Sequence, residues 1–267
     1  MAIRTVFSMA EDCVRGQRQG WQEFVRDYSG IARALLTHYF PTLAPEIDEH
    51  AVAVFRRAGG NGASWFAGLN FTNEREFMMA FRDLVFAYGR EQERVPAPPI
   101  GLDRVRAIMK DLTLLERELL WLVIKGHDSV RIAAIMMNAA ATAEAVQRIA
   151  GERLNALAPR GASGHPVIPT PVLMELAEQS KTEKCASLKT FNNLVNGQIT
   201  WREREQAEEH MHDCFYCIDR FTTFQEMVRL RKDMPPLLEP QVEAVLAKLP
   251  VAAGKPRGTL SRLFAGR

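Results

Sequence analysis

The sequence predicts an all-α protein built from several small helical domains. Apolar residues recur at steps of three and four along most of the 267-residue chain, and clean alternation with a period of two is hard to find. Segments rich in proline, glycine and alanine at 93–101 and 158–169 interrupt this pattern and indicate linkers. We therefore expect the following division: domains at 1–95, 102–157 and 170–233, then a short helix and a basic tail at 234–267.

The composition is ordinary for a globular protein, with 47% hydrophobic and 25% charged residues. The net charge of +2 is nearly balanced, so any nucleic acid must be bound by a local basic patch. Four cysteines are too few for a secreted disulfide framework, which favours metal or redox chemistry in a reducing compartment. No stretch approaches about 18 apolar residues and the N-terminus lacks the apolar core of a signal peptide, so we expect a cytoplasmic protein without a membrane span.

Helical periodicity is clear in the first domain. Residues 45–58 begin with acidic side chains and end with two arginines, an order that complements the helix dipole. A longer helix is expected over 74–90, with Thr72 or Asn73 as its cap. Before both, residues 8–38 carry an apolar stripe at helical spacing, made of Trp21, Phe24, Val25, Tyr28, Ile31, Ala32 and Leu35.

The segment between these helices, residues 59–73, is rich in glycine and is expected to form a loop. It carries three aromatic side chains, Trp65, Phe66 and Phe71. These rings could stack on an unpaired base of melted DNA. They could equally pin the loop onto the helical core, as aromatic residues near glycines often do. The sequence leaves both interpretations open.

The second domain has the outline of a helix-turn-helix. Thr113 and Glu116 form a capping-box pattern ahead of an apolar run, and Gly126 ends the helix that follows. Further helices are expected over 129–137 and 142–157. Helices joined by short turns at this spacing are typical of DNA-binding domains.

The third domain and the tail are also expected to be helical. Thr200 and Glu203 form a second capping-box pattern, and Asn196 followed by Gly197 indicates a turn. The expected helices are 171–178, 183–195, 201–212, 215–232 and, in the tail, 240–248.

The third domain holds a candidate metal site with the spacing His-x3-Cys-x2-Cys. His210 lies near the end of one expected helix, Cys214 and Cys217 lie one turn apart at the start of the next, and Cys185 lies 25 residues before His210. Zinc prefers four sulfur or nitrogen ligands in a tetrahedron, and a helix N-terminus favours the thiolate that binds the metal. Because four protein ligands leave no open position, we expect one structural zinc ion.

Other assignments compete with this site. His212 lies two residues from His210, so on a helix the two side chains cannot point the same way. His165 in a linker and Cys13 in the first domain are poorer candidates for ligands. In the competing interpretation the cysteines are small core residues and the histidine lies at the surface. A catalytic zinc needs an open position, and no Ser/His/Asp, Walker or GxGxxG pattern occurs, so we expect no enzymatic activity.

Residues 171–232, with the motif on Cys185, His210, Cys214 and Cys217, resemble the zinc-binding anti-sigma domain of bacterial proteins that restrain extracytoplasmic-function sigma factors. The segment LVNGQITWREREQAEEH resembles the turn and capped helix that precede the histidine in that family.

The two preceding domains resemble parts of sigma-70-like factors. Residues 20–92 resemble region 2, with PEIDEHAVAVFRRA at the helix that grips the polymerase clamp. WFAGLNFTNEREFMMAFRDLVFAYGR corresponds to the promoter-melting loop and the helix that reads the −10 element. Residues 112–157 resemble region 4, the helix-turn-helix that reads the −35 element, through LTLLERELLWLVIKG and AGERLNAL. The whole resembles an extracytoplasmic-function sigma factor with a fused C-terminal zinc-binding anti-sigma-like domain.

The resemblance implies three further sets of site residues. The candidates for polymerase contact are Glu46, Asp48, Glu49, Phe55 and Arg56. The candidates for melting the −10 element are Trp65, Phe66, Phe71, Arg75 and Arg82. The candidates for reading the −35 element are Thr142, Gln147, Arg148 and Arg153.

The implied function is that of a DNA-binding transcription initiation factor that directs core RNA polymerase to promoter DNA. The zinc domain would pack on the sigma-like domains of its own chain and modulate their activity, and covalent attachment would keep its effective concentration high. A regulatory protein could release it, or oxidation that joins Cys185 to Cys214 or Cys217 and expels zinc.

The alternative is a zinc-stabilised interaction module with degenerate sigma-like domains. In the expected recognition helix the cations Arg148 and Arg153 are balanced by Glu144 and Glu152. Because lysine and arginine supply the phosphate contacts of DNA-binding proteins, this face predicts weak DNA binding. Such a module would bind a sigma factor or polymerase without reading DNA.

Overall fold

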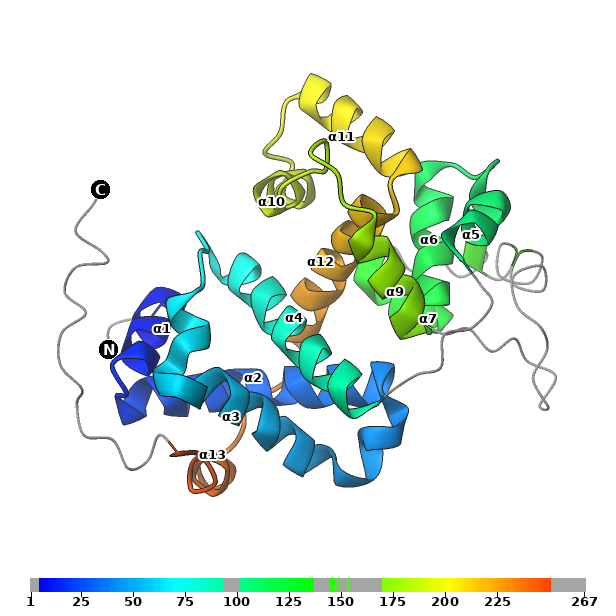
Figure 1. The fold of residues 1–267 in the computed structure, drawn as a ribbon. Helices are drawn as coiled ribbons and strands as arrows, with labels where there is room; N and C mark the ends of the chain where they lie inside the picture. The colour runs from blue at the N-terminus through cyan, green and yellow to red at the C-terminus, as the bar shows by residue number, and fades with distance from the viewer. Residues whose placement is uncertain are drawn as a thin grey trace. The chain divides into compact units, whose positions relative to one another are not determined.

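A computed structural model describes residues 5–93, 101–136, 145, 146, 148, 153 and 170–250, with 61–64 described by their backbone alone. Within these residues every regular element is a helix and none is a strand, so the all-α prediction is confirmed (Figure 1). The elements are α1 Val6–Val14, α2 Arg18–Tyr39, the 3-10 helix η1 Pro41–Glu46, α3 Ile47–Ala67, α4 Glu74–Gln92, α5 Leu102–Met109, α6 Leu114–Ile124, α7 Ser129–Met136, α9 Thr170–Gln179, α10 Leu188–Asn196, α11 Trp201–Asp213, α12 Phe215–Asp233 and α13 Glu239–Leu246.

The chain divides into two compact units. The second contains Gly89–Asp233 and the short piece His38–Phe40, so α5–α7 and α9–α12 belong to one unit. The first contains Met1–Thr37, Pro41–Tyr88 and Met234–Arg267, which includes α13. The expected division at the linkers stays a prediction, because compactness alone does not say which segments fold independently.

The first unit is built around a cluster of aromatic rings from α2, α3 and α4. Phe24 of α2 is fully buried and lies at the centre. Edge-to-face and tilted ring pairs of this kind add to the stability gained from burial alone. The rings within 6.1 Å of that of Phe24, between centroids, are those of Trp21, Tyr28, Phe55, Trp65, Phe66, Phe77 and Phe81.

The glycine-rich segment 59–73 is not the loop that its composition predicts, because α3 continues through it to Ala67. Each glycine costs a helix about 1 kcal/mol relative to alanine, and three glycines lie in α3. Here the helix places Trp65 and Phe66 against Phe24, and the burial of these rings offsets that cost.

The C-terminal helix α13 packs within the first unit. Val242 is fully buried and Leu246 is 3% exposed. The Glu243 carboxylate pairs with Arg18 and accepts a hydrogen bond of 3.0 Å from the Gln22 amide, both on α2. Two residues before α13 begins, the Leu237 amide donates to the Arg26 carbonyl of α2 at 2.9 Å.

In the second unit α12 packs against α6, α7, α9, α10 and α11 (Figure 1). The predicted capping boxes of α6, by Thr113 and Glu116, and of α11, by Thr200 and Glu203, are both confirmed. The core is continuous from α5 to α12, and its most deeply buried members are Val105, Leu120, Trp121, Leu122, Ile132, Leu173 and Ala177.

One expected helix of this unit begins later than predicted, and another lies largely outside the described residues. The helix expected over 183–195 begins only at Leu188, because the Ser187 side chain caps it by accepting from the Thr190 amide at 3.2 Å. The helix expected over 142–157 lies largely outside the described residues, so the helix-turn-helix stays a prediction.

A buried ion pair joins α12 to the end of α6. Lys125 is 1% exposed, and its ammonium lies 3.0 Å from the Glu226 carboxylate and 2.9 Å from the Thr223 hydroxyl. His127 Nε2 lies 3.3 Å from the same carboxylate. Burial alone would raise the pKa of Glu226, but Lys125 and His127 outweigh it and hold this pKa well below its usual range.

Removing one partner of this ion pair should lower the stability of the fold more than removing both partners. Lys125→Met leaves the Glu226 carboxylate buried without its main partner and should cost about 3 kcal/mol of stability. The double variant Lys125→Met, Glu226→Leu should cost less than Lys125→Met alone. Denaturant unfolding of the full chain measures the stability of both variants. A double variant that is less stable than Lys125→Met alone would contradict this account.

A second buried carboxyl, Glu118 of α6, should make stability depend on pH. Burial, with a smaller contribution from Glu208 of α11, raises the pKa of Glu118 from 4.5 to about 8. The folded state therefore keeps a proton that the unfolded state releases, so stability is fully present below pH 4.5 and falls as the pH rises through 8.

Glu118→Gln should remove this dependence while keeping the shape of the side chain. We expect the variant to be more stable than wild type by about 2 kcal/mol at pH 8 and no more stable near pH 4. Thermal or denaturant unfolding at both pH values checks this. An equal effect at both would show that the pKa of Glu118 does not differ between the folded and unfolded states.

Candidate metal centre

Four side chains of the second unit converge on one point. His210 lies in the last turn of α11, Cys214 between α11 and α12, Cys217 in the first turn of α12, and Cys185 in the turn before α10. Their donor atoms all lie within 4.8 Å of one another, so the cluster could hold a metal ion. The structure thus brings together the four residues whose spacing predicts the site.

The break between α11 and α12 is local to Cys214. This residue adopts an extended conformation, with φ −105° and ψ 108°, which ends α11. Its amide donates to the His210 carbonyl at 3.1 Å, and its carbonyl accepts from the Ile218 amide at 3.1 Å. One residue therefore closes one helix and opens the next, which sets the side chains of His210 and Cys217 on the same side of the turn as its own.

Cys185 reaches the site from a turn, not from the expected helix. Its amide donates to the Thr182 carbonyl at 3.1 Å, and its sulfur accepts from the Thr182 amide at 3.1 Å. The sulfur atoms of Cys185 and Cys214 lie 3.6 Å apart. Two thiolates bonded at about 2.3 Å to a tetrahedral zinc ion would lie about 3.8 Å apart. This edge of the cluster already has the size that zinc requires.

The chemistry of the donors also fits a metal. Nε2 of His210 is buried and has no hydrogen-bond partner among the described residues, which is costly unless an ion binds it. A hydrogen bond from the Cys217 thiol lowers the pKa of Cys214 to about 5, and the same bond, together with burial, raises the pKa of Cys217. The lowered pKa favours the thiolate form of Cys214, which is the form that binds a metal.

The competing ligands do not join the cluster. The side chain of His212 is 41% exposed and its Nδ1 lies 3.2 Å from the Asp213 carboxylate. Cys13 is fully buried on α1 in the first unit. His165 lies outside the described residues.

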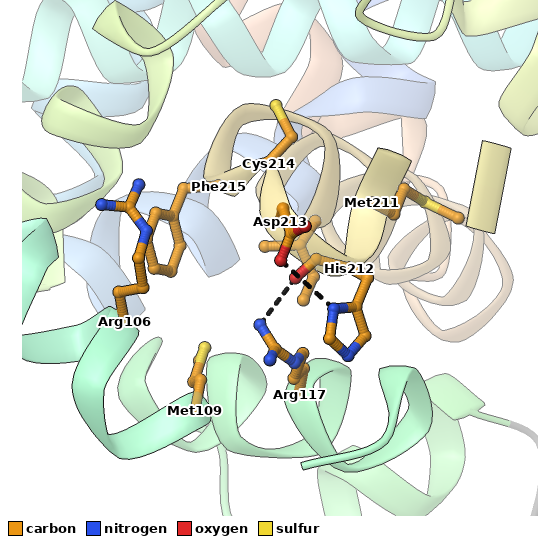
Figure 2. A pocket seen from close by; sticks show the side chains of 9 residues that line it. Arg106, Met109, Arg117, Met211, His212, Asp213, Cys214 and Phe215 are labelled. Carbon is orange, nitrogen blue, oxygen red and sulfur yellow. Dashed lines mark hydrogen bonds and ion pairs between the residues drawn. The ribbon is translucent and has the colours of Figure 1, made fainter. Parts of the chain in front are cut away.

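A small pocket lies behind the ligand turn, on the side of α5 and α6 (Figure 2). Arg106 and Met109 of α5 and Arg117 of α6 line it, opposite Met211, His212, Asp213, Cys214, Phe215 and Ile218. In Figure 2 the Arg117 guanidinium points at the main chain of His212. Arg117 is not among the site residues that the sequence predicts.

The aromatic candidates for promoter melting lie in or against the first unit's core. Phe66 is 4% exposed, and Trp65 is half-buried with its ring 4.8 Å from that of Phe66. Phe71 is half-buried and stacks on Phe7 at 4.8 Å. These positions agree with the core-pinning interpretation, and stacking of the Phe66 ring on a base would require this core to open.

The cationic candidates have partners within the chain. Arg82 is 3% exposed, with its guanidinium 3.7 Å from the centre of the Phe86 ring. Arg148 is exposed but lies 2.8 Å from the Glu116 carboxylate. Arg75 and Arg153 are half-buried, and Thr142 and Gln147 lie outside the described residues. DNA contact by these side chains stays a prediction.

The candidates for polymerase contact divide into a buried and an exposed group. Phe55 is fully buried in the aromatic core. Glu46, Asp48, Glu49 and Arg56 are exposed, and Asp48 pairs with Arg33 at 2.8 Å. Two of them meet the residue Lys248 that follows α13. Its ammonium pairs with Glu49, and its carbonyl accepts from Arg56 at 2.9 Å.

No protein-family model matches the sequence, and no curated protein or solved structure matches it. In the part of the chain that the structure describes, no helix combines the length and apolar character needed to cross a bilayer.

Zinc binding should depend on His210 but not on its neighbour His212. We expect the purified chain to hold one zinc ion. His210→Ala and Cys214→Ser should each weaken zinc binding by more than roughly 100-fold, because losing a residue that only supports a ligand already weakens binding by up to about that factor. His212→Ala is the matched control and should bind zinc normally. Competition with a chromophoric chelator measures the affinities. Equal losses for the two histidine variants would contradict the assignment.

Proposed function

We propose that the chain is a sigma-70-like transcription initiation factor whose C-terminal part restrains it, and that its metal centre holds one structural zinc ion. The first unit would bind core RNA polymerase through α3, and the second unit would contact promoter DNA. The resemblance of the sequence to region 2, region 4 and a zinc-binding anti-sigma domain supports this proposal.

The observation that carries the proposal is the position of Lys248. The resemblance assigns α3 to the polymerase clamp, and the residues after α13 contact Glu49 and Arg56 on that helix. Burial of Val242 and Leu246 holds α13 in place. A partner that uses the Glu49 and Arg56 side chains must therefore displace the end of α13, and this competition is how the C-terminal part would restrain the factor.

A specific contact also keeps the alternative function open. Arg148, the exposed cation expected to face DNA, pairs with Glu116 of α6 at 2.8 Å. A paired arginine contributes less to phosphate binding. The chain could therefore bind polymerase, or a sigma factor, without reading a promoter.

Undocking α13 should strengthen polymerase binding. Val242→Asp places a charge in the buried contact of α13, whereas Leu238→Asp makes the same kind of change at a side chain that is 70% exposed. We expect Val242→Asp to bind core polymerase about tenfold more tightly, about 1.4 kcal/mol, and Leu238→Asp to match wild type.

Promoter activity separates the two functions. In transcription with core polymerase, a chain ending at residue 233, which keeps α12 and loses α13, should initiate more strongly than the full chain. Polymerase binding without initiation at any promoter would favour the interaction module. No binding by any variant would contradict both.

A further inference from the structure

The guanidinium group of Arg117 is enclosed by main-chain carbonyl groups. It donates to Leu112 at 3.0 Å and to Lys110 at 3.0 Å. Its third hydrogen bond, to the His212 carbonyl at 2.6 Å, is drawn in Figure 2. The residue is only 5% exposed. Two of these carbonyls belong to the segment between α5 and α6, and the third belongs to the last turn of α11. Arg117 therefore ties the α11 end to the base of α6.

The bonded carbonyl lies inside the metal-binding segment. His212 stands between the ligands His210 and Cys214, at the C-terminus of a helix, where carbonyls have no partner within the helix. A cation is favourable at such an end. By fixing the His212 carbonyl, Arg117 limits how the main chain between two ligands can move.

A second contact fixes the other side of Cys214. The next residue, Phe215, is 5% exposed and its ring lies 5.6 Å from that of Trp121 on α6. Main chain on one side of Cys214 and side chain on the other are thus held by α6.

We propose that Arg117 is a positioning residue of the metal centre and that it couples metal binding to the packing of α6 on the ligand turn. The inference rests on the metal assignment made above, and not on the role in transcription. Coupling of this kind is reciprocal. If Arg117 arranges the turn for the metal, a bound metal must stabilise the contact of α6 with the turn by the same factor.

Variants of Arg117 test the proposal through metal affinity. In Arg117→Met the charge and all three hydrogen bonds are lost. In Arg117→Lys the charge remains, but one ammonium cannot replace the planar guanidinium across three carbonyls. Arg106→Met is the matched control, because Arg106 lies over Phe215 and pairs with Asp103, which is not in the ligand turn.

We expect zinc affinity, measured by chelator competition on the full chain, to fall about tenfold in Arg117→Met and about threefold in Arg117→Lys, within the usual range of coupling between sites. Arg106→Met should stay within about twofold of wild type. The visible spectrum of the cobalt-loaded protein should show a distorted site in the Arg117 variants. Circular dichroism identifies any variant that does not fold, and if Arg117→Met fails to fold, Arg117→Lys decides.

Two results would overturn the proposal. One is wild-type zinc affinity in a folded Arg117 variant, which would leave Arg117 a structural residue only. The other is an equal loss in Arg106→Met, which would point to general charge near the thiolates. Neither result bears on polymerase binding. A wild-type chain that binds no zinc would remove the metal assignment itself, and the proposal with it.

Discussion

The second unit depends on how α12 satisfies the polar groups that it buries. A helix enclosed on most sides is ordinarily apolar throughout, yet α12 buries Asp219, Thr223 and Glu226. Each needs a partner, since an unpaired buried polar group costs several kcal/mol. Trp121 donates to Asp219 at 3.0 Å, and Lys125 donates to Thr223 and pairs with Glu226. These partners fix α12 against α6 in one register.

That register also positions the metal centre. The first turn of α12 carries Cys217, and the residue before the helix is Cys214, so any shift of α12 along α6 would displace two ligands. Arg117 holds the end of α11 from the same helix α6. The metal centre and the packing of α6 are therefore parts of one arrangement. Under the proposed function α6 belongs to a DNA-binding domain, so a change at the metal centre would reach that domain through this packing.

The sequence could predict features that depend on neighbouring residues, and it missed those that depend on distant ones. The capping boxes and the spacing of His210, Cys214 and Cys217 are local, and they were predicted. Continuation of α3 through the glycines depends on burial of Trp65 and Phe66, which propensity does not include. Arg117 was missed, although it left a signal: it lies four residues before Trp121 on the buried stripe of α6, where a charged residue needs a special partner.

Amide hydrogen exchange with and without zinc tests most directly whether the metal centre and α6 form one arrangement. Removing zinc from the full chain should speed exchange both in the segment 210–217 and in α6, because loss of the ligand turn frees the helix that it contacts. Faster exchange confined to 210–217, with α6 as protected as before, would show that the metal fixes only its own loop and would contradict the account.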